Sequence, residues 1–112
     1  MGDRVAIVTG GTRAIGRAVS LRLAQDGFIV AANYRSNQIE ADQTRNALVA
    51  VQPRSLVVQA DVSHPDEAQS LVNKVLAQLG RVDVLVNNVG PWYDGGLLET
   101  TPEQWRTTLD GN

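Results

Sequence analysis

The sequence predicts an α/β fold in which a parallel β-sheet is covered by helices on both faces. Short apolar runs rich in β-branched residues alternate with helical patterns along the whole chain. The first run, Val5–Val8, passes directly into a glycine-rich turn and then a helix, and the later runs end in polar or small residues. Strands that alternate with helices are joined by right-handed crossovers, which make the strands parallel and bury both faces of the sheet.

Four strands are expected, each followed by a helix. The strands are predicted at Val5–Val8, Phe28–Asn33, Ser55–Gln59 and Val82–Val86, and the helices begin near Ile15, Gln38, Pro65 and Pro102. The third helix has the clearest apolar face, and Gly80 is suited to end it as a C-cap. The order β-α-β-α-β-α-β-α predicts a Rossmann-like, doubly wound parallel sheet, truncated after about four βα units.

Composition limits the classes of protein that the chain can belong to. With 112 residues it is expected to form one domain, residues 1–112. A net charge of −2 without a cluster of basic residues argues against a nucleic-acid partner. The absence of cysteine excludes disulfides, thiolate metal sites and a catalytic thiol. No apolar run approaches membrane-spanning length, and the first strand begins too close to Met1 for a signal peptide, so a cytoplasmic protein without a membrane partner is expected.

The turn after the first strand has the character of a phosphate-binding turn. Gly10 and Gly11 allow the chain to turn where a side chain would obstruct it. The small residues Ala14 and Gly16 would let backbone amides at the start of the next helix approach an anion closely. The turn therefore predicts a dinucleotide ligand.

Two common glycine patterns do not fit this turn. Gly11 and Gly16 have the spacing of the P-loop, G-x-x-x-x-G-K-(S/T), but Arg17 and Ala18 stand where the lysine and the hydroxyl should be. The dinucleotide pattern G-x-G-x-x-G fails whether it is started from Gly10 or from Gly11. For the turn taken alone, an ordinary strand–helix turn rich in glycine remains an alternative.

The pattern that does stand here is T-G-x-x-x-A-x-G, from Thr9 to Gly16. It resembles the T-G-x-x-x-(G/A)-x-G turn of the short-chain dehydrogenase/reductase family. Asp61 after the third strand and Asn87–Gly90 after the fourth extend the resemblance, with valine in place of the alanine of the family's N-N-A-G pattern. The match covers the whole chain in the right order, and the segment from Asn88 onward looks most like bacterial 3-oxoacyl-acyl-carrier-protein reductases.

The end of the second strand indicates which nicotinamide dinucleotide would bind. An NAD-binding domain usually has an acidic residue there for the ribose hydroxyl, but Tyr34 stands at about that position and Arg35 follows. A guanidinium would pair with a 2′-phosphate, and Arg13 in the turn could reach the same group. Either arginine alone is equally well explained as a solvated surface charge. With both arginines and no nearby carboxylate, NADP(H) is expected rather than NAD(H).

The ends of the third and fourth strands complete the expected cofactor site. The carboxylate of Asp61 would accept a hydrogen bond from the adenine amino group, and it equally suits the start of the following helix. Asn87 and Asn88 would bridge neighbouring strands, and Gly90 would keep the backbone close to the cofactor ribose. The expected cofactor-binding residues are Thr9, Gly10, Thr12, Arg13, Ala14, Ile15, Gly16, Tyr34, Arg35, Asp61, Val62, Asn88, Val89 and Gly90.

The resemblance implies a hydride transfer between nicotinamide and the carbonyl or alcohol carbon of a small-molecule substrate. In this family a tyrosine, with a lysine four residues later, acts as the general acid or base, while a serine and an asparagine assist. Asn112 matches that asparagine and is the one catalytic residue expected in the chain. The serine and the Tyr-x-x-x-Lys pair are absent, so the chain alone is expected to be inactive. Homo-oligomerisation is implied by the resemblance only.

Two interpretations of the missing catalytic residues remain open. The chain is either the cofactor-binding part of a longer enzyme or a truncated, non-catalytic nucleotide-binding or interaction module. The first is favoured because Val82–Val86 would otherwise form an open, apolar sheet edge. An extended-type epimerase or dehydratase is disfavoured, because Arg13 stands where such a protein would have glycine.

Overall fold

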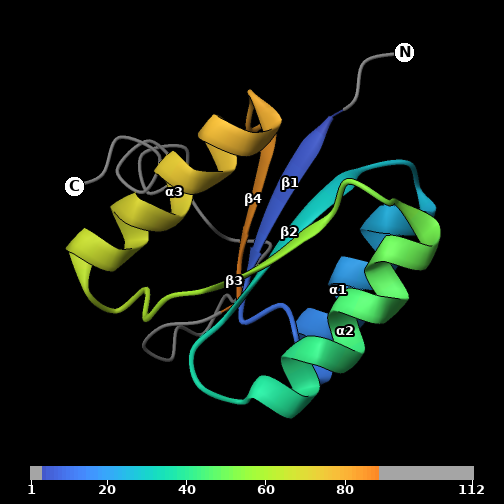
Figure 1. Ribbon diagram of the computed structural model, residues 1–112, viewed down its shortest axis with the longest axis horizontal. Helices are drawn as coiled ribbons and strands as arrows, with labels where there is room; N and C mark the ends of the chain where they lie inside the picture. The colour runs from blue at the N-terminus through green and yellow to red at the C-terminus, as the bar shows by residue number, and fades with distance from the viewer. Residues whose placement is uncertain (1–3, 89–112) are drawn as a thin grey trace.

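Four parallel strands form the centre of the molecule, in the order β3-β2-β1-β4 (Figure 1). The computed structural model describes residues 4–88. Its elements are β1 (Val5–Thr9), α1 (Ala14–Gln25), β2 (Ile29–Tyr34), α2 (Gln38–Val51), β3 (Leu56–Gln59), α3 (Pro65–Leu79) and β4 (Val84–Asn87). β1 lies between β2 and β4, with Ile7 opposite Ala31 on one side and Leu85 on the other.

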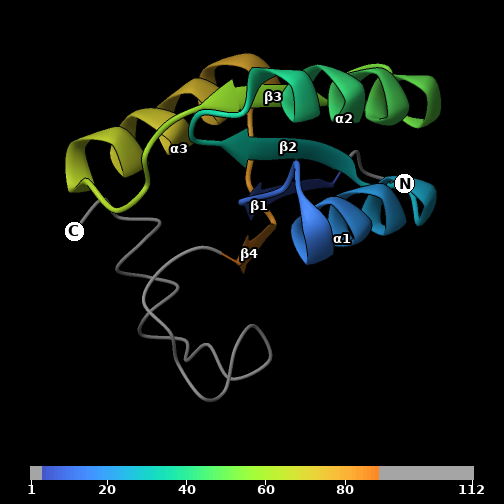
Figure 2. The same cartoon turned by 90° about the horizontal axis from the view of Figure 1, so that it is seen from below.

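The helices cover both faces of this sheet, as expected for a doubly wound fold. α1 and α2 lie together on one face and α3 lies on the other (Figures 1 and 2). This arrangement follows from the strand order. The chain moves outward from β1 to β3 through two right-handed crossovers on one face, and the crossover back to β4 must then pass over the other face.

Each face of the sheet has its own hydrophobic cluster. Val5 and Ile7 of β1 pack with Leu71, Val72 and Val75 of α3. The alternate residue of β1, Val8, packs on the opposite face with Ala24 of α1 and Leu48 of α2. Because both faces are covered, β1 is buried along its whole length and its sequence is apolar without alternation.

The predicted elements are confirmed within residues 4–88, with shifts of one or two residues at some ends. β4 begins at Val84 rather than Val82, because Asp83 uses its carboxylate and its amide to bind the backbone of Val5. α3 ends as expected at Gly80, whose φ of 82° is left-handed. The helix expected near Pro102 lies outside the described residues. In the described part of the chain, no helix is long and apolar enough to cross a membrane.

Candidate functional site

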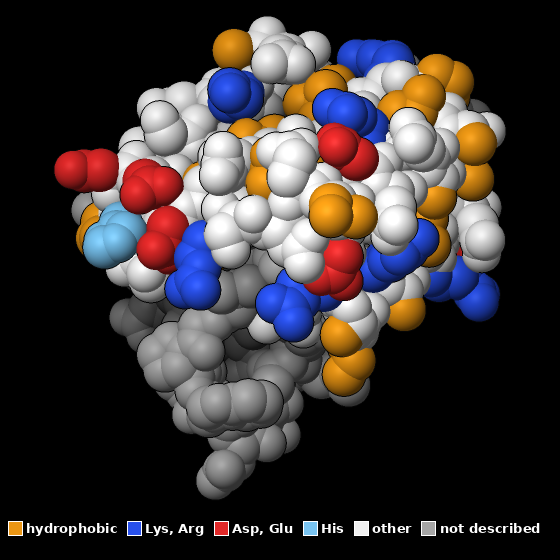
Figure 3. Space-filling view, turned by 60° about the horizontal axis from the view of Figure 1, so that its bottom comes forward, with side chains coloured by type: hydrophobic (Ala, Val, Ile, Leu, Met, Phe, Trp, Pro, Cys, Tyr) orange, Lys and Arg blue, Asp and Glu red, His pale blue; other side chains and the backbone are white. Residues whose placement is uncertain are grey.

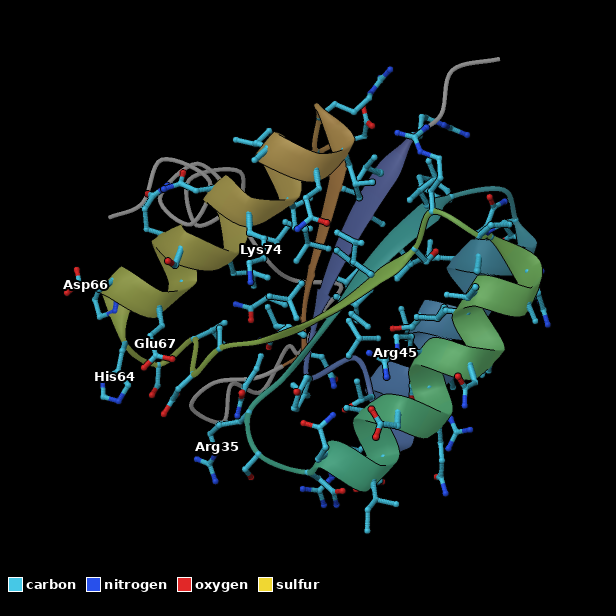
Figure 4. The ribbon with its side chains drawn as sticks, viewed as in Figure 1. Arg35, Arg45, His64, Asp66, Glu67 and Lys74 are labelled. Atoms are coloured by element: carbon cyan, nitrogen blue, oxygen red, sulfur yellow. The ribbon has the colours of Figure 1, made fainter. Side chains whose placement is uncertain are left out.

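The residues expected to bind the cofactor lie at the carboxyl ends of the strands. The glycine turn connects β1 to α1 there, Tyr34 ends β2 and is followed by Arg35, and Asp61 follows β3. Figure 4 shows Arg35 beyond the end of β2, between the first turns of α2 and α3 in that view. In an open α/β sheet, ligands bind at this edge, where the strand order reverses. In this molecule the reversal lies between β1 and β4.

Close backbone packing explains the glycines of the turn. Gly10 has a φ of 60°, which an L side chain seldom adopts. A Cβ on Gly16 would overlap the carbonyl oxygen of Gly10 and lie 2.6 Å from Asn88 Nδ2. Gly16 is therefore required so that α1 can pack against the turn. Ala14 has a φ of 49°, so the first residue of α1 carries a local strain of roughly 1–2 kcal/mol.

The hydroxyl of Thr12 lacks a hydrogen-bond partner although the residue is only 1% exposed. Its backbone is held in place, because its carbonyl accepts a hydrogen bond from Thr44 Oγ1 at 3.2 Å. On the other side of the turn, the buried Ser20 hydroxyl donates to the carbonyl of Gly11 at 3.0 Å. A buried hydroxyl without a partner is costly. It is the kind of group that a ligand oxygen would satisfy.

Asn33 is the buried polar residue that fixes the turn against the sheet, and it was missed at the level of the sequence. Its side chain is 2% exposed, and its Oδ1 accepts a hydrogen bond from the amide of Gly10 at 3.3 Å. Its Nδ2 donates to the carbonyl oxygens of Ala60 at 2.9 Å and Val58 at 3.3 Å. Its own carbonyl accepts from the amide of Gly11 at 2.8 Å. The available signal was a polar residue inside the otherwise apolar strand β2.

Thr9, Asn87 and Asn88 join the carboxyl ends of β1 and β4. Thr9 Oγ1 donates to Asn87 Oδ1 at 3.1 Å and accepts from the amide of Asn88 at 2.9 Å. Asn88 Nδ2 donates to the carbonyl oxygen of Gly10 at 3.3 Å. The expectation that the two amide side chains bridge neighbouring strands is confirmed. This bridge also fixes the turn from the side opposite Asn33.

The residues at the end of β2 are held by the elements beside them. The Tyr34 hydroxyl donates to Gln38 Oε1 at 2.9 Å, which ties the strand end to the first turn of α2. The carbonyl oxygen of Arg35 accepts from Gln59 Nε2 at 3.1 Å, while the Arg35 side chain is exposed. The guanidinium of Arg35 therefore extends into solvent from a backbone that is held in place.

A carboxylate lies beside Arg13, which corrects the expectation that both arginines lack a nearby acid. Glu40 Oε1 lies 3.5 Å from Arg13 Nε. The interaction was not foreseen because Arg13 and Glu40 lie far apart in the chain. Only the packing of α1 against α2 brings them together. The sequence does contain the motif Asn37-x-x-Glu40, which indicates that Glu40 stands in the first turn of α2.

Asp61 lies in the loop between β3 and α3, where its carboxylate accepts two hydrogen bonds. Its Oδ1 accepts from the hydroxyl of Ser63 at 2.6 Å and from the amide of Ser63 at 3.1 Å. These two hydrogen bonds, followed by the charges of His64 and Arg35, lower the pKa of the Asp61 carboxyl below its ordinary value. The carboxylate binds Ser63 in the loop before α3, whose first residue is Pro65, so the helix-start role foreseen for Asp61 stays a prediction. Its role toward adenine stays a prediction.

The structure places most of the expected residues along one edge. The turn residues Thr9, Gly10, Thr12, Arg13, Ala14, Ile15 and Gly16 lie with Asn88, while Tyr34, Arg35, Asp61 and Val62 follow the neighbouring strands. Ile15 is exposed at the first turn of α1, whereas Val62 packs against the α3-side cluster. Val89, Gly90 and Asn112 lie outside the described residues.

Charged groups of both signs surround this edge. Figure 3, in which the carboxyl ends of the strands come forward, shows Lys or Arg side chains interspersed with Asp or Glu. Within residues 4–88, no group of three His, Cys, Asp or Glu residues is arranged to hold a metal ion. The described part of the site consists of backbone amides, neutral hydroxyls and amides, the carboxylate of Asp61, and two arginines at its border.

Three comparisons agree with this architecture. The family model "short chain dehydrogenase" matches residues 4–112. An oxidoreductase of Methylorubrum extorquens is 41% identical over 97% of this chain and 44% of its own length. A 3-oxoacyl-(acyl-carrier-protein) reductase of Staphylococcus epidermidis is 36% identical over 98% of this chain and 45% of its own length.

A solved structure extends the similarity from sequence to geometry. A Serratia marcescens short-chain dehydrogenase/reductase, crystallised as a double mutant, superposes with a TM-score of 0.74 and is 32% identical. The superposition covers 95% of this chain and 43% of the Serratia chain. The chain thus spans less than half the length of the relatives that it matches. It belongs to the short-chain dehydrogenase family.

Proposed function

We propose that this chain supplies the cofactor-binding half of an NADP(H)-dependent oxidoreductase of the short-chain type. The observation that carries the proposal is the buried, unpartnered hydroxyl of Thr12 in a turn whose backbone is fixed on three sides. α1 begins at this turn and has no side-chain cap from Arg13. Its first amides are therefore oriented as donors for an anion.

The chemistry of the residues present fits a dinucleotide phosphate. The Thr12 hydroxyl and the amides of the turn would donate to pyrophosphate oxygens. The proposed acceptor for the adenine amino group is Asp61 Oδ2, which also lies 3.4 Å from His64 Nε2, because Asp61 Oδ1 is engaged by Ser63. A bound nicotinamide dinucleotide would supply the hydride carrier for a carbonyl or alcohol substrate.

The two arginines support NADP(H) over NAD(H). Arg35 extends from the end of β2 and Arg13 from the turn, so both border the position where an adenosine ribose would lie. Guanidinium groups bind phosphate through paired hydrogen bonds. NAD(H) has no 2′-phosphate and would gain nothing from either arginine.

Titration of the intact protein with NADPH and NADH tests the proposal. We expect tighter binding of NADPH. Arg35→Ala should remove most of that preference and leave NADH binding unchanged. Lys74→Ala, which removes an exposed cation in the middle of α3, is the matched control and should change neither affinity (Figure 4). Equal or tighter binding of NADH by the unmodified protein would contradict the proposed cofactor.

The substrate and assembly follow from the relatives as proposals. One relative is named for reduction of a 3-oxoacyl group, so the substrate is proposed to be a small carbonyl or alcohol compound. Oxidation of NADPH by the intact protein with a panel of ketones tests this. Residues 1–112 alone, which hold Asn112 but no Tyr-x-x-x-Lys pair, are expected to bind cofactor without turnover. A cytoplasmic homo-oligomer is proposed as well, and the mass of the assembly in solution would test the oligomer.

A further inference from the structure

Arg13 and Arg35 are placed in different electrostatic surroundings. Arg13 Nε lies 3.5 Å from the carboxylate of Glu40, and the two side chains are 69% and 33% exposed. Arg35 affects the pKa of Asp61 only as the last of several causes, and no ion pair joins them in the described part of the chain. The guanidinium of Arg13 thus already has an anionic partner before a ligand arrives.

Glu40 is held more firmly than an ordinary surface carboxylate. Its Oε1 accepts a hydrogen bond from Asn37 Nδ2 at 2.6 Å, and its amide donates to Asn37 Oδ1 at 3.0 Å. Asn37 is the N-cap of α2, so this reciprocal pair fixes the Glu40 side chain at the start of the helix. Little side-chain entropy remains to be lost when Arg13 pairs with it.

α2 cannot move away from the turn without breaking a buried contact. One helical turn after Glu40, Thr44 donates to the carbonyl oxygen of Thr12, which is the residue before Arg13. Thr12 and Thr44 are both fully buried. Two consecutive turns of α2 therefore hold two consecutive residues of the glycine turn, and the carboxylate of Glu40 stays within reach of Arg13.

We propose that Glu40 is a positioning residue that competes with the 2′-phosphate of NADP(H) for Arg13. Binding of a 2′-phosphate must draw the guanidinium away from Glu40 or share it. Part of the attraction between Arg13 and the phosphate is then offset by the lost ion pair. NAD(H) leaves Arg13 with Glu40, so its affinity does not depend on this pair. Glu40 would thus set how strongly the site prefers NADP(H), an inference that rests on the proposed function.

The expected effect is modest because the ion pair is partly solvated. Exposed pairs of this kind contribute about 0.2–1 kcal/mol, which corresponds to roughly a two- to fivefold change in affinity at the upper end. Glu40→Gln keeps the length of the side chain and its contact with Asn37 but removes the charge. In the intact protein we expect it to bind NADPH about two- to fivefold more tightly, with NADH binding unchanged.

Two further variants separate this effect from a change in folding or in overall charge. Glu40→Asp keeps the charge but shortens the side chain away from Arg13, so it should shift the NADPH:NADH affinity ratio in the same direction. Asp26→Asn makes the same change in net charge and breaks a similar exposed pair, with Arg22, at the opposite end of α1. That control should leave the ratio unchanged.

A double-mutant cycle decides whether Glu40 acts through Arg13. In an Arg13→Ala background, Glu40→Gln should no longer change NADPH affinity. If the full increase persists without Arg13, Glu40 repels the phosphate directly and the competition is excluded. If folded Glu40→Gln and Glu40→Asp both leave the ratio unaltered while the unmodified protein binds NADPH, this inference fails and the proposed function stands. If the unmodified protein binds neither cofactor, both fail.

Discussion

The two ends of β1 are tied to β4 in different ways, although the same two strands meet at each end. At the amino end, the carboxylate of Asp83 accepts from the amide of Val5 at 2.8 Å and is clamped by the guanidinium of Arg81 at 2.7 Å. At the carboxyl end, neutral groups of Thr9, Asn87 and Asn88 make the connection.

The consequences for the backbone differ as well. At the amino end the Asp83 amide also donates a hydrogen bond to the carbonyl of Val5, so Val5 and Asp83 are joined by two hydrogen bonds. At the carboxyl end the same kind of connection carries a glycine turn, with a left-handed residue at Gly10 and a buried hydroxyl without a partner at Thr12. Costly features gather at the end where a ligand is proposed to bind.

Substitution of Gly16 should break the carboxyl end most severely. A Cβ at this position would overlap the Gly10 carbonyl, which is backbone and cannot move aside without deforming the turn. We expect Gly16→Ala to lower the free energy of unfolding by about 3 kcal/mol. Cofactor binding should be lost even under conditions in which the variant remains folded. Urea denaturation and an NADPH titration measure the two effects.

Gly80→Ala is the matched control for that substitution. Gly80, unlike Gly16, has a positive φ, 82°, and nothing lies within 4 Å of the position that its Cβ would take. It should cost only about 1 kcal/mol from backbone strain and leave cofactor affinity unchanged. A similar loss of binding in both variants would show that general destabilisation, and not the geometry of the turn, controls the site.

Replacement of Asn33 tests whether the turn depends on a buried amide. Asn33→Leu has a similar size but leaves the Gly10 amide and the Ala60 carbonyl without their partner. We expect a loss of about 2–3 kcal/mol in urea denaturation and weaker cofactor binding. Asn73→Ala removes an exposed amide whose Oδ1 only accepts from Gln69, and it should change stability by less than about 0.5 kcal/mol. If Asn33→Leu and Asn73→Ala changed stability equally, the turn would not depend on the buried amide of Asn33.

The elements that depend on residues close together in the chain could be predicted from the sequence. The strands, the three described helices and the left-handed end at Gly80 follow from local patterns of apolar residues and glycine. The motif of the turn likewise indicated the carboxyl ends of the strands, where the turn lies in the structure.

What escaped prediction depends on contacts between distant segments. Asn33 could be assigned no role until β2 was known to lie between β1 and β3, because its partners belong to the turn and to the end of β3. Glu40 could not be paired with Arg13 before α2 was placed against α1. Gly16 was expected to admit an anion, whereas in the structure the group that requires its missing side chain is the Gly10 carbonyl.

Thr12→Val tests stability and cofactor binding separately at one residue of the turn that follows the carboxyl end of β1. Valine fills the same space without a hydroxyl, so the buried, unpartnered oxygen disappears. We expect the free energy of unfolding to rise by about 1 kcal/mol. Affinity for both NADPH and NADH should fall to a similar extent, because the hydroxyl is proposed to bind the pyrophosphate that they share. If the variant is more stable and binds both cofactors as tightly as the original protein, the Thr12 hydroxyl does not bind the pyrophosphate.

Asp83→Asn should weaken the amino end, with an effect that depends on pH. The hydrogen bond from Arg81, followed by that from the Val5 amide, lowers the pKa of Asp83 below its ordinary 3.8. A carboxyl whose pKa is lower in the folded state stabilises the protein above its unfolded-state pKa, and this contribution is lost as the pH falls through the folded value. The variant should therefore be less stable than the original at pH 7, and the difference should shrink as the pH falls through the lowered pKa of Asp83. Asp61, whose pKa is also lowered, keeps its own acid dependence in both proteins.

NADPH affinity at pH 7 should be unchanged by Asp83→Asn, because Asp83 lies at the end of the sheet opposite the turn. A constant stability difference from pH 7 to pH 3 would mean that the charge of Asp83 plays no part in holding β4 to β1.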